Sequence, residues 1–444
     1  MRSKKGVAAA LGAAALAGAL AVPVSADGAT GDRVTRLSTD AGRQLDLPSG
    51  MSEISATGRY VAFVSDADDL VDGDTNGFGD VFRLDRRTGE VVRVNVSDAG
   101  EQANADLGEN WTISISADGR YVAFGSGADN LVEGDGNDAD DVFVKDVESG
   151  KVTRVSEGTG DVEADGASFE PSISYGGRLV AYQSVARNIS DVDLPPDAVA
   201  TVRTYVTEVV TGQTRLVALS SGETPSNRGT SAGVISADGR FVAFESDATN
   251  LVTGDGNGRG DVFVRDLERG TTRRVSVSGR GREAARGAWG PSISADGRHV
   301  AFASASPDLV AGDRNREPDV FVRDRRANTT ARASVTPSGG AFAGMSFGPE
   351  ISGDGATVAF LFRKANPDRA GEYVGHDHLY VRDLAAATTT LASHDRDGGR
   401  ADDSSTMPAV DHDGGLVTFT SAASDLVRRD TNGMSDVFLW RRAP

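Results

Sequence analysis

The residues of this chain that are best suited to hold a cation recur in one short pattern, Asp-x-Asn-x-x-x-Asp. Its first and third positions match the start of a calcium-binding loop, where a hard cation takes several oxygen ligands from a tightly curved backbone. The third acid falls at position seven, and the glutamate that closes a full calcium loop is missing. The predicted metal ligands are Asp74, Asn76, Asp80, Asp135, Asn137, Asp141, Asp255, Asn257, Asp261, Asp313, Asn315, Asp319, Asp430, Asn432 and Asp436.

Turn chemistry is the alternative interpretation of this pattern. Asp and Asn side chains accept hydrogen bonds from their own backbone and are common where a loop leads into a strand. Both interpretations stay open on the sequence, and calcium is the only cofactor that the chain suggests.

Four aromatic residues also recur at a fixed place, eight residues before a glycine that marks a repeated phrase. Rings at the mouth of a channel would form a stacking surface for a sugar or a peptide. Packing between neighbouring repeats is the structural alternative. The predicted ligand-binding residues are Trp111, Phe169, Trp289 and Phe347.

Catalytic patterns are weak in this chain. No Gly-x-Ser-x-Gly phrase is followed by a hydrolase domain. Paired carboxylates for glycoside hydrolysis are not identifiable, because aspartate is abundant in every repeat. His376 and His378 lie two residues apart and offer a partial transition-metal pair without a third ligand. No catalytic residue is therefore predicted.

The elements that position these residues come from one repeated phrase, best seen as Ser-Ala-Asp-Gly-Arg-Tyr-Val-Ala-Phe. Its glycine recurs seven times, in steps of 58 to 62 residues, and a fixed period of this size indicates a repeat architecture. The marker glycines are Gly58, Gly119, Gly177, Gly239, Gly297, Gly355 and Gly414.

Each repeat predicts four short strands joined by Asp/Gly turns, as in one blade of a β-propeller. In the fourth repeat the strands are expected at 234–236, 241–246, 261–266 and 271–277. The seventh repeat lacks its fourth strand, and residues 33–38 resemble a fourth strand from inside the chain. The sequence thus predicts an all-β, seven-bladed β-propeller of four-stranded blades, closed by the N-terminal strand completing the last blade.

Two of these phrases resemble a known family. Ser-Ala-Asp-Gly-Arg-Tyr-Val-Ala-Phe at 116–124 and Asp-Val-Phe-Val-Arg-Asp at 261–266 are similar to the repeat of TolB-type propellers. The resemblance covers essentially the whole of residues 27–444 and implies the propeller fold and a role in envelope translocation. This chain departs from the family in its longer loop between the second and third strands, and no α/β domain is visible ahead of the propeller.

The ends and the composition set the expected location. Basic residues, an apolar run at 7–22 and a small-residue site before Ala26 predict a signal peptide over 1–26, with the propeller over 27–444. The net charge of −19 argues against nucleic acid and anionic membranes as partners. We expect a secreted or extracytoplasmic monomer without membrane insertion. The chain has no cysteine and so no disulfide.

The function predicted from these features is a non-catalytic binding or scaffold module, stabilised by calcium. Its partner would be a protein, peptide or glycan ligand at the channel mouth. The alternatives are a propeller enzyme acting on polysaccharide, as a lyase or glycosidase, and a TolB-like component of envelope translocation. Repeats three and six deviate most from the pattern, at 191–204 and 364–378, and are the places where function is expected.

Overall fold

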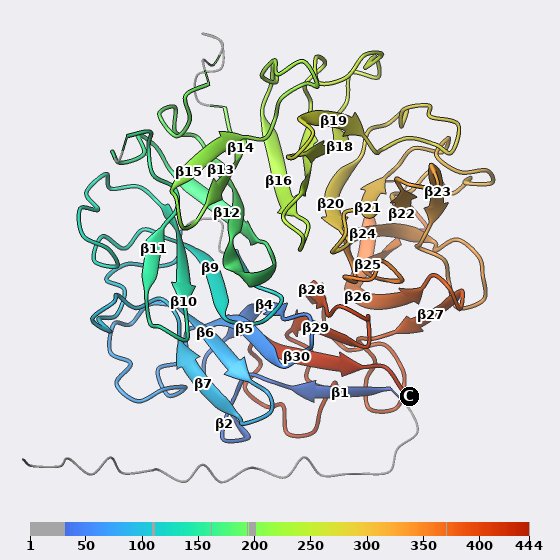
Figure 1. Ribbon diagram of the computed structural model, residues 1–444. Helices are drawn as coiled ribbons and strands as arrows, with labels where there is room; N and C mark the ends of the chain where they lie inside the picture. Colours follow the sequence, from blue (N-terminus) through green and yellow to red (C-terminus); the bar gives the residue numbers. More distant parts are fainter. Residues whose placement is uncertain are drawn as a thin grey trace, which may run out of the picture.

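Seven four-stranded antiparallel sheets are arranged in a ring, with the chain colours running once around it (Figure 1). The computed structural model describes residues 32–443 except 109–111, 161, 193, 195–200 and 370. The predicted signal peptide and Trp111 lie outside the described residues. Because every blade has four strands and the sheets close in a circle, the predicted seven-bladed propeller is confirmed.

Blades are numbered here in chain order of their innermost strands. Blade 1 holds β4 (Ser49–Ile54), β5 (Tyr60–Ser65), β6 (Asp80–Asp85) and β7 (Glu90–Arg93); blade 2 holds β8 (Ile113–Ile115), β9 (Tyr121–Ser126), β10 (Asp141–Asp146) and β11 (Val152–Arg154). Blade 3 holds β12 (Ser168–Ile173), β13 (Leu179–Ser184), β14 (Arg203–Glu208) and β15 (Gln213–Leu216), with a short 3₁₀ turn at Tyr175–Gly177. Blade 4 holds β16 (Thr230–Ile235), β17 (Phe241–Ser246), β18 (Asp261–Asp266) and β19 (Thr271–Arg274).

The remaining blades follow the same order. Blade 5 holds β20 (Trp289–Ile293), β21 (His299–Ser304), β22 (Asp319–Asp324) and β23 (Thr329–Arg332); blade 6 holds β24 (Gly344–Ile351), β25 (Thr357–Ala365), β26 (Tyr373–Asp383) and β27 (Thr388–Leu391). Blade 7 holds β28 (Ser405–Val410), β29 (Leu416–Ser421) and β30 (Asp436–Arg441), and β1 (Arg33–Arg36) is its fourth strand. A small hairpin, β2 (Thr39–Asp40) and β3 (Arg43–Gln44), leads from β1 toward blade 1.

Ring closure occurs where the sequence predicts it. β1 pairs antiparallel with β30, in register from Arg33 opposite Arg441 to Arg36 opposite Phe438. Figure 1 shows blue β1 beside red β30. This pairing joins the two ends of the described chain in one sheet, so no blade is left with an open edge there.

The core lies between and within the blades. The Val-Ala-Phe of the second strand and the Val-Phe-Val of the third strand are buried, and their two rings stack within each blade, as Phe244 and Phe263 do at 5.7 Å between centroids. The buried clusters join neighbouring blades; one unites Leu179 and Val206 of blade 3 with Val242 of blade 4. Each blade therefore depends on the next for its apolar contacts.

The marker turn is fixed by both backbone and packing. Gly119 has φ +76°, and a Cβ built there would lie 2.1 Å from the ring of Tyr60 in blade 1. Glycine is needed here because a side chain would be strained by φ and would clash with the neighbouring blade. Ser116 Oγ accepts a 3.0 Å bond from Tyr121 N, so the serine of the phrase closes the same turn. Among the described residues no helix has the length and hydropathy of a membrane span.

Candidate functional site

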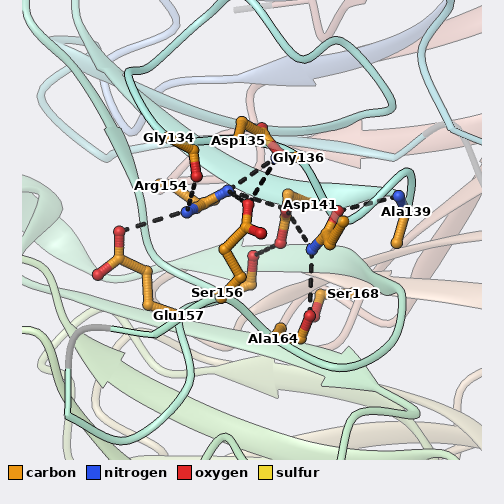
Figure 2. A network of polar contacts seen from close by, with 12 residues as sticks. Gly134, Asp135, Gly136, Ala139, Asp141, Arg154, Ser156, Glu157, Ala164 and Ser168 are labelled. Atoms are coloured by element: carbon orange, nitrogen blue, oxygen red, sulfur yellow. Dashed lines mark hydrogen bonds and ion pairs between the residues drawn. The ribbon is translucent and has the colours of Figure 1, made fainter.

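The acidic loops meet an arginine that the sequence prediction did not include. Arg154 on β11 lies with its Nη1 3.0 Å from Asp135 Oδ1 and 3.5 Å from Asp141 Oδ2, the first and last acids of the blade 2 motif (Figure 2). Asn137 Nδ2 donates to Asp141 Oδ2 at 3.2 Å, and Asn137 Oδ1 accepts from Ala139 N at 2.9 Å. The guanidinium thus lies between the two carboxylates that the calcium hypothesis assigns to an ion.

The same arrangement recurs in all five blades that carry the motif. A serine or asparagine two residues after the arginine also donates to the last acid, as Ser276 Oγ does to Asp261 at 2.6 Å. The arginines that pair with the two acids of their motif are Arg36, Arg93, Arg154, Arg274 and Arg332. The asparagine at the third position of each motif accepts a hydrogen bond from the backbone two residues later, as the turn interpretation predicts.

The two deviating blades lose both partners together. In blade 3, Arg203 stands at the position of the last acid and Leu216 at that of the arginine. In blade 6 these positions hold His378 and Leu391. Acid and arginine therefore behave as one unit of the repeat, which favours a structural role for the pair.

Burial dominates the electrostatics of the motif acids. It raises the pKa of Asp141 to about 6, against the opposing hydrogen bond from Ser156 and the charge of Arg154. The pKa of Asp261 is raised for the same reason. A carboxylate held in a buried site needs a cationic neighbour, and arginine supplies it here.

One acidic cluster has the spacing of a cation site. Carboxylate oxygens of Asp255, Asp261 and Glu283 lie within 4.8 Å of one another. Arg274 Nη1 reaches all three carboxylates, at 3.5, 3.1 and 2.6 Å. A metal ion at this cluster would have to displace the guanidinium. Calcium itself stays a prediction.

A second site, which sequence reasoning did not identify, lies in the central channel. The innermost strands border a cavity of about 450 Å³, within the range of small-molecule sites. The residue before the isoleucine or valine of each innermost strand differs around the ring: Glu53, Ser114, Ser172, Val234, Ser292, Glu350 and Ala409. The serines connect blades, since Ser114 Oγ accepts from Ile173 N at 3.1 Å and Ser172 Oγ from Ile235 N at 3.1 Å.

The two glutamates in this ring are exceptional. Burial, and secondarily the charge of Glu350, raises the pKa of Glu53 to about 8. Burial raises the pKa of Glu350 to about 7, while a 2.9 Å bond from Ser292 Oγ opposes the rise. No lysine or arginine is found among the described residues that line this cavity. The channel thus holds two acids that are protonated in part at neutral pH and lack a cationic partner.

Further polar groups lie at the ends of this cavity. Glu170 lines it with a left-handed backbone, φ +52°, at the β-bulge of β12, and accepts a hydrogen bond from Gln183 Nε2. Tyr175, 61% exposed, and His412 belong to the ring of turns at the other end. The same left-handed bulge recurs at Met51, Ala232, Gly290, Gly348 and Met407, so this backbone conformation belongs to the repeat and only the carboxylate is particular to blade 3.

The predicted aromatic residues lie beside this channel and not on its described wall. Phe169, Trp289 and Phe347 stand near the start of their innermost strands and are half-buried. Phe347 packs against the apolar cluster shared by blades 6 and 7. Their role in ligand binding stays a prediction, and Trp111 is outside the described residues.

Comparisons with known proteins agree on the architecture. No protein-family model matches the chain, and no curated protein matches it. Among solved structures, the oligogalacturonate lyase of Vibrio parahaemolyticus is 12% identical with a TM-score of 0.55, over 92% of this chain and 93% of that one. An oligogalacturonate lyase in complex with manganese is 14% identical with a TM-score of 0.56, over 94% of both chains.

TolB structures are also among the matches, as the repeat phrase predicts. TolB from Acinetobacter baumannii is 13% identical with a TM-score of 0.39, over 90% of this chain and 80% of that one. At these identities the likeness concerns the fold alone. The chain is thus similar in architecture to the two lyase propellers, and its activity has to be argued from its own site.

Proposed function

We propose that this chain is a secreted, monomeric binding module without catalytic activity, and that its central channel binds a neutral or cationic group of a glycan or peptide. The observation that carries the proposal is the Glu53 and Glu350 pair, two acids in a cavity of about 450 Å³ lined by no described lysine or arginine. Half-buried acids without a lysine or arginine on the described wall are costly to the fold and are therefore candidates for a role in function.

The charge of the channel selects the ligand. Glu53, Glu170 and Glu350 all line the cavity, so an anionic ligand would be repelled. A protonated carboxyl donates a hydrogen bond to a sugar hydroxyl or a peptide carbonyl, whereas an ammonium or guanidinium group would replace the proton. The exposed ring of Tyr175 offers a stacking surface at the rim.

A glycan and peptide array screen, followed by titration calorimetry of the best ligand, tests this proposal. The variant E53Q/E350Q should lose the pH dependence of binding, and E245Q is the matched control because Glu245 is a half-buried acid outside the described cavity wall. Affinity for a cationic ligand should rise as the pH increases through 7 to 8, and affinity for a neutral hydrogen-bond acceptor should fall. Equal effects of both variants would refute the channel site.

Glycoside hydrolysis is the second candidate, and the same pair favours it. Glu53, with its pKa raised to about 8, has the properties of a general acid, and Glu350, at about 7, those of the base or nucleophile. Release of reducing ends from a bound glycan, lost in E53Q and in E350Q but kept in E245Q, would establish this activity. If the bound glycan stayed intact after long incubation, hydrolysis would be refuted and the non-catalytic binding module would be the remaining interpretation. An acidic substrate such as oligogalacturonate fits the acidic channel poorly.

Envelope translocation is the remaining alternative. Co-purification of the protein with other envelope components would support it, and isolation as a lone monomer would count against it.

We also propose that calcium binds at the cluster of Asp255, Asp261 and Glu283. Its three carboxylates suit a hard cation, but Arg274 competes for the same oxygens. We expect a small rise in melting temperature with millimolar calcium and a larger rise in R274Q, because a ligand that binds only the native state stabilises it. Identical melting in calcium and in chelator for both proteins would exclude calcium from this cluster.

A further inference from the structure

A basic groove lies between blades 4 and 5, although the chain as a whole carries a net charge of −19. The groove encloses about 760 Å³, and its wall has eight arginines and three aspartates among sixteen residues. This excess of positive charge is on the face of the marker turns and is separate from the central channel, since no described residue lines both cavities.

Part of this charge is already neutralised within the fold. Arg240 Nη2 lies 2.7 Å from Asp266 Oδ2, and Arg298 Nη2 lies 2.6 Å from Asp324 Oδ2. These two pairs hold the marker turns of blades 4 and 5 against their third strands. They have counterparts in blades 1 and 2 and belong to the repeat.

The remaining charge is particular to this groove. Arg269, Arg273 and Arg326 are exposed on its wall, and within the described structure no carboxylate pairs with their side chains. At the position of Arg273, the other blades have Thr35, Val92, Thr153, Arg215, Ala331 and Thr390. Only the neighbouring blade 3 shares the arginine, so the repeat does not require it.

A half-buried arginine on the same wall, Arg325, adds to the crowding. Arg325 Nη1 donates to Gly297 O, and Arg325 Cζ lies 4.4 Å from the centroid of the Phe241 ring. Arg240 Cζ lies 4.9 Å from the same ring. Burial, with the charges of Arg273 and Arg240, lowers the pKa of Arg325 to about 10, although Asp266 opposes this. The guanidinium groups of the two blades therefore repel one another across the groove.

We propose that this groove binds a multiply charged oxyanion, held by the unpaired guanidinium groups of Arg269, Arg273 and Arg326. Guanidinium groups recognise carboxylate and phosphate oxygens in pairs, and an anion with several such groups would neutralise the crowded charges together. The shared chemistry is a row of oxyanion groups; phosphates and carboxylates are its two sources. The site does not depend on the function proposed for the channel.

Titration calorimetry with inorganic tripolyphosphate and with citrate tests the proposal and distinguishes the two sources. The double variant R273Q/R326Q should bind at least a hundredfold more weakly than the natural chain, because two charge-assisted contacts are lost and each is expected to contribute at least a factor of ten. R273K/R326K keeps the charge without paired recognition and should show an intermediate loss. Binding should also weaken as salt is raised.

The matched control is R87Q/R215Q, which removes two exposed arginines at the equivalent positions of blades 1 and 3. It has the same net charge as R273Q/R326Q and lies outside the described groove wall. The control should keep its affinity within about twofold. Equal losses of affinity in both double variants would show that binding depends only on the overall charge of the protein and would overturn the proposal. The absence of binding to both anions would overturn it as well.

Discussion

Two groups of acids in this propeller, the buried acids of the loops and the half-buried glutamates of the channel, differ in their partners. In the acidic loops, Asp141 lies against Arg154, Asn137 and Ser156. In the central channel, burial and the charge of Glu350 raise the pKa of Glu53, and no lysine or arginine lies on the described wall beside it. Burial raises the pKa of Asp141 to about 6 and that of Glu53 to about 8, so the loop acid is the better compensated of the two.

This difference in partners distinguishes acids that stabilise the fold from acids that the fold does not require. The loop acids recur in five blades, always with their arginine, and disappear with it in blades 3 and 6. Each channel glutamate stands where three other blades place a serine that bonds to the next blade, as Ser114 does to Ile173. A recurrent, paired charge is explained by stability, whereas an isolated and unpaired one calls for a ligand.

Removing the arginine of one loop is expected to have the largest effect. R274M leaves Asp255, Asp261 and Glu283 without their common cation, and breaking a buried ion pair from one side costs about 3 to 5 kcal/mol. Denaturant unfolding at pH 7 should show this loss of free energy. The loss should shrink on acidification, because protonated acids no longer need the arginine.

The control for R274M is the double variant R274M/D261N, in which acid and arginine are both removed as in blades 3 and 6. It should be more stable than R274M alone, because one uncompensated charge has gone. If R274M cost less than about 1 kcal/mol, the loop acids would not be a stabilising unit and the contrast with the channel would fail.

Much of the fold was predictable from the sequence because it is carried by local chemistry that repeats. Gly119 and Ser116 determine the marker turn, and the match between residues 33–38 and an internal fourth strand identified the ring closure. The arginine that pairs with the loop acids lies on the fourth strand of its blade, and the sequence analysis did not connect it with the acidic motif. Its pairing joins residues 13 to 19 positions apart in the chain, such as Arg154 with Asp141 and Asp135.

The candidate site was harder to predict for a physical reason. Glu53 and Glu350 are far apart in sequence, and they share one cavity wall and influence each other's charge only when the blades close around one axis. A signal did exist, since aligning the repeats at the residue before the isoleucine or valine places glutamate against serine, valine or alanine. The expectation that function lies at 191–204 and 364–378, where repeats three and six deviate, stays a prediction, and Glu53 and Glu350 both lie outside these ranges.

The channel acids should have an intermediate effect that depends on pH. Their pKa values in the folded protein, about 8 for Glu53 and about 7 for Glu350, exceed the ordinary value of 4.5. The native state therefore holds protons that the unfolded chain releases, and stability falls as the pH rises from about 4.5 to 8. E53Q/E350Q should remove this fall and be more stable than the natural chain at pH 8.

Thermal and denaturant unfolding of both proteins between pH 4 and 8 checks this prediction. E245Q is again the control, because Glu245 lies outside the described channel wall. Parallel stability curves for E53Q/E350Q and the natural chain would mean that the channel acids have a compensating partner and resemble the loop acids after all.

The smallest effect is expected at the ion pairs of the marker turns, which recur like the loop acids but have a more exposed arginine, 34% for the Arg59 side chain against 9% for that of Arg274. Hydrogen bonds from Arg59 lower the pKa of Asp85 to about 2, below its ordinary 3.8. The stabilisation is therefore present above pH 3.8 and lost as the pH falls through 2. R59Q should lower the melting temperature less than R274M does, and high salt should diminish the difference because exposed pairs are screened. R59Q could instead lower the melting temperature as much as R274M does, also in high salt. That result would show that the recurrence of an ion pair, and not its burial, determines how much it stabilises this propeller.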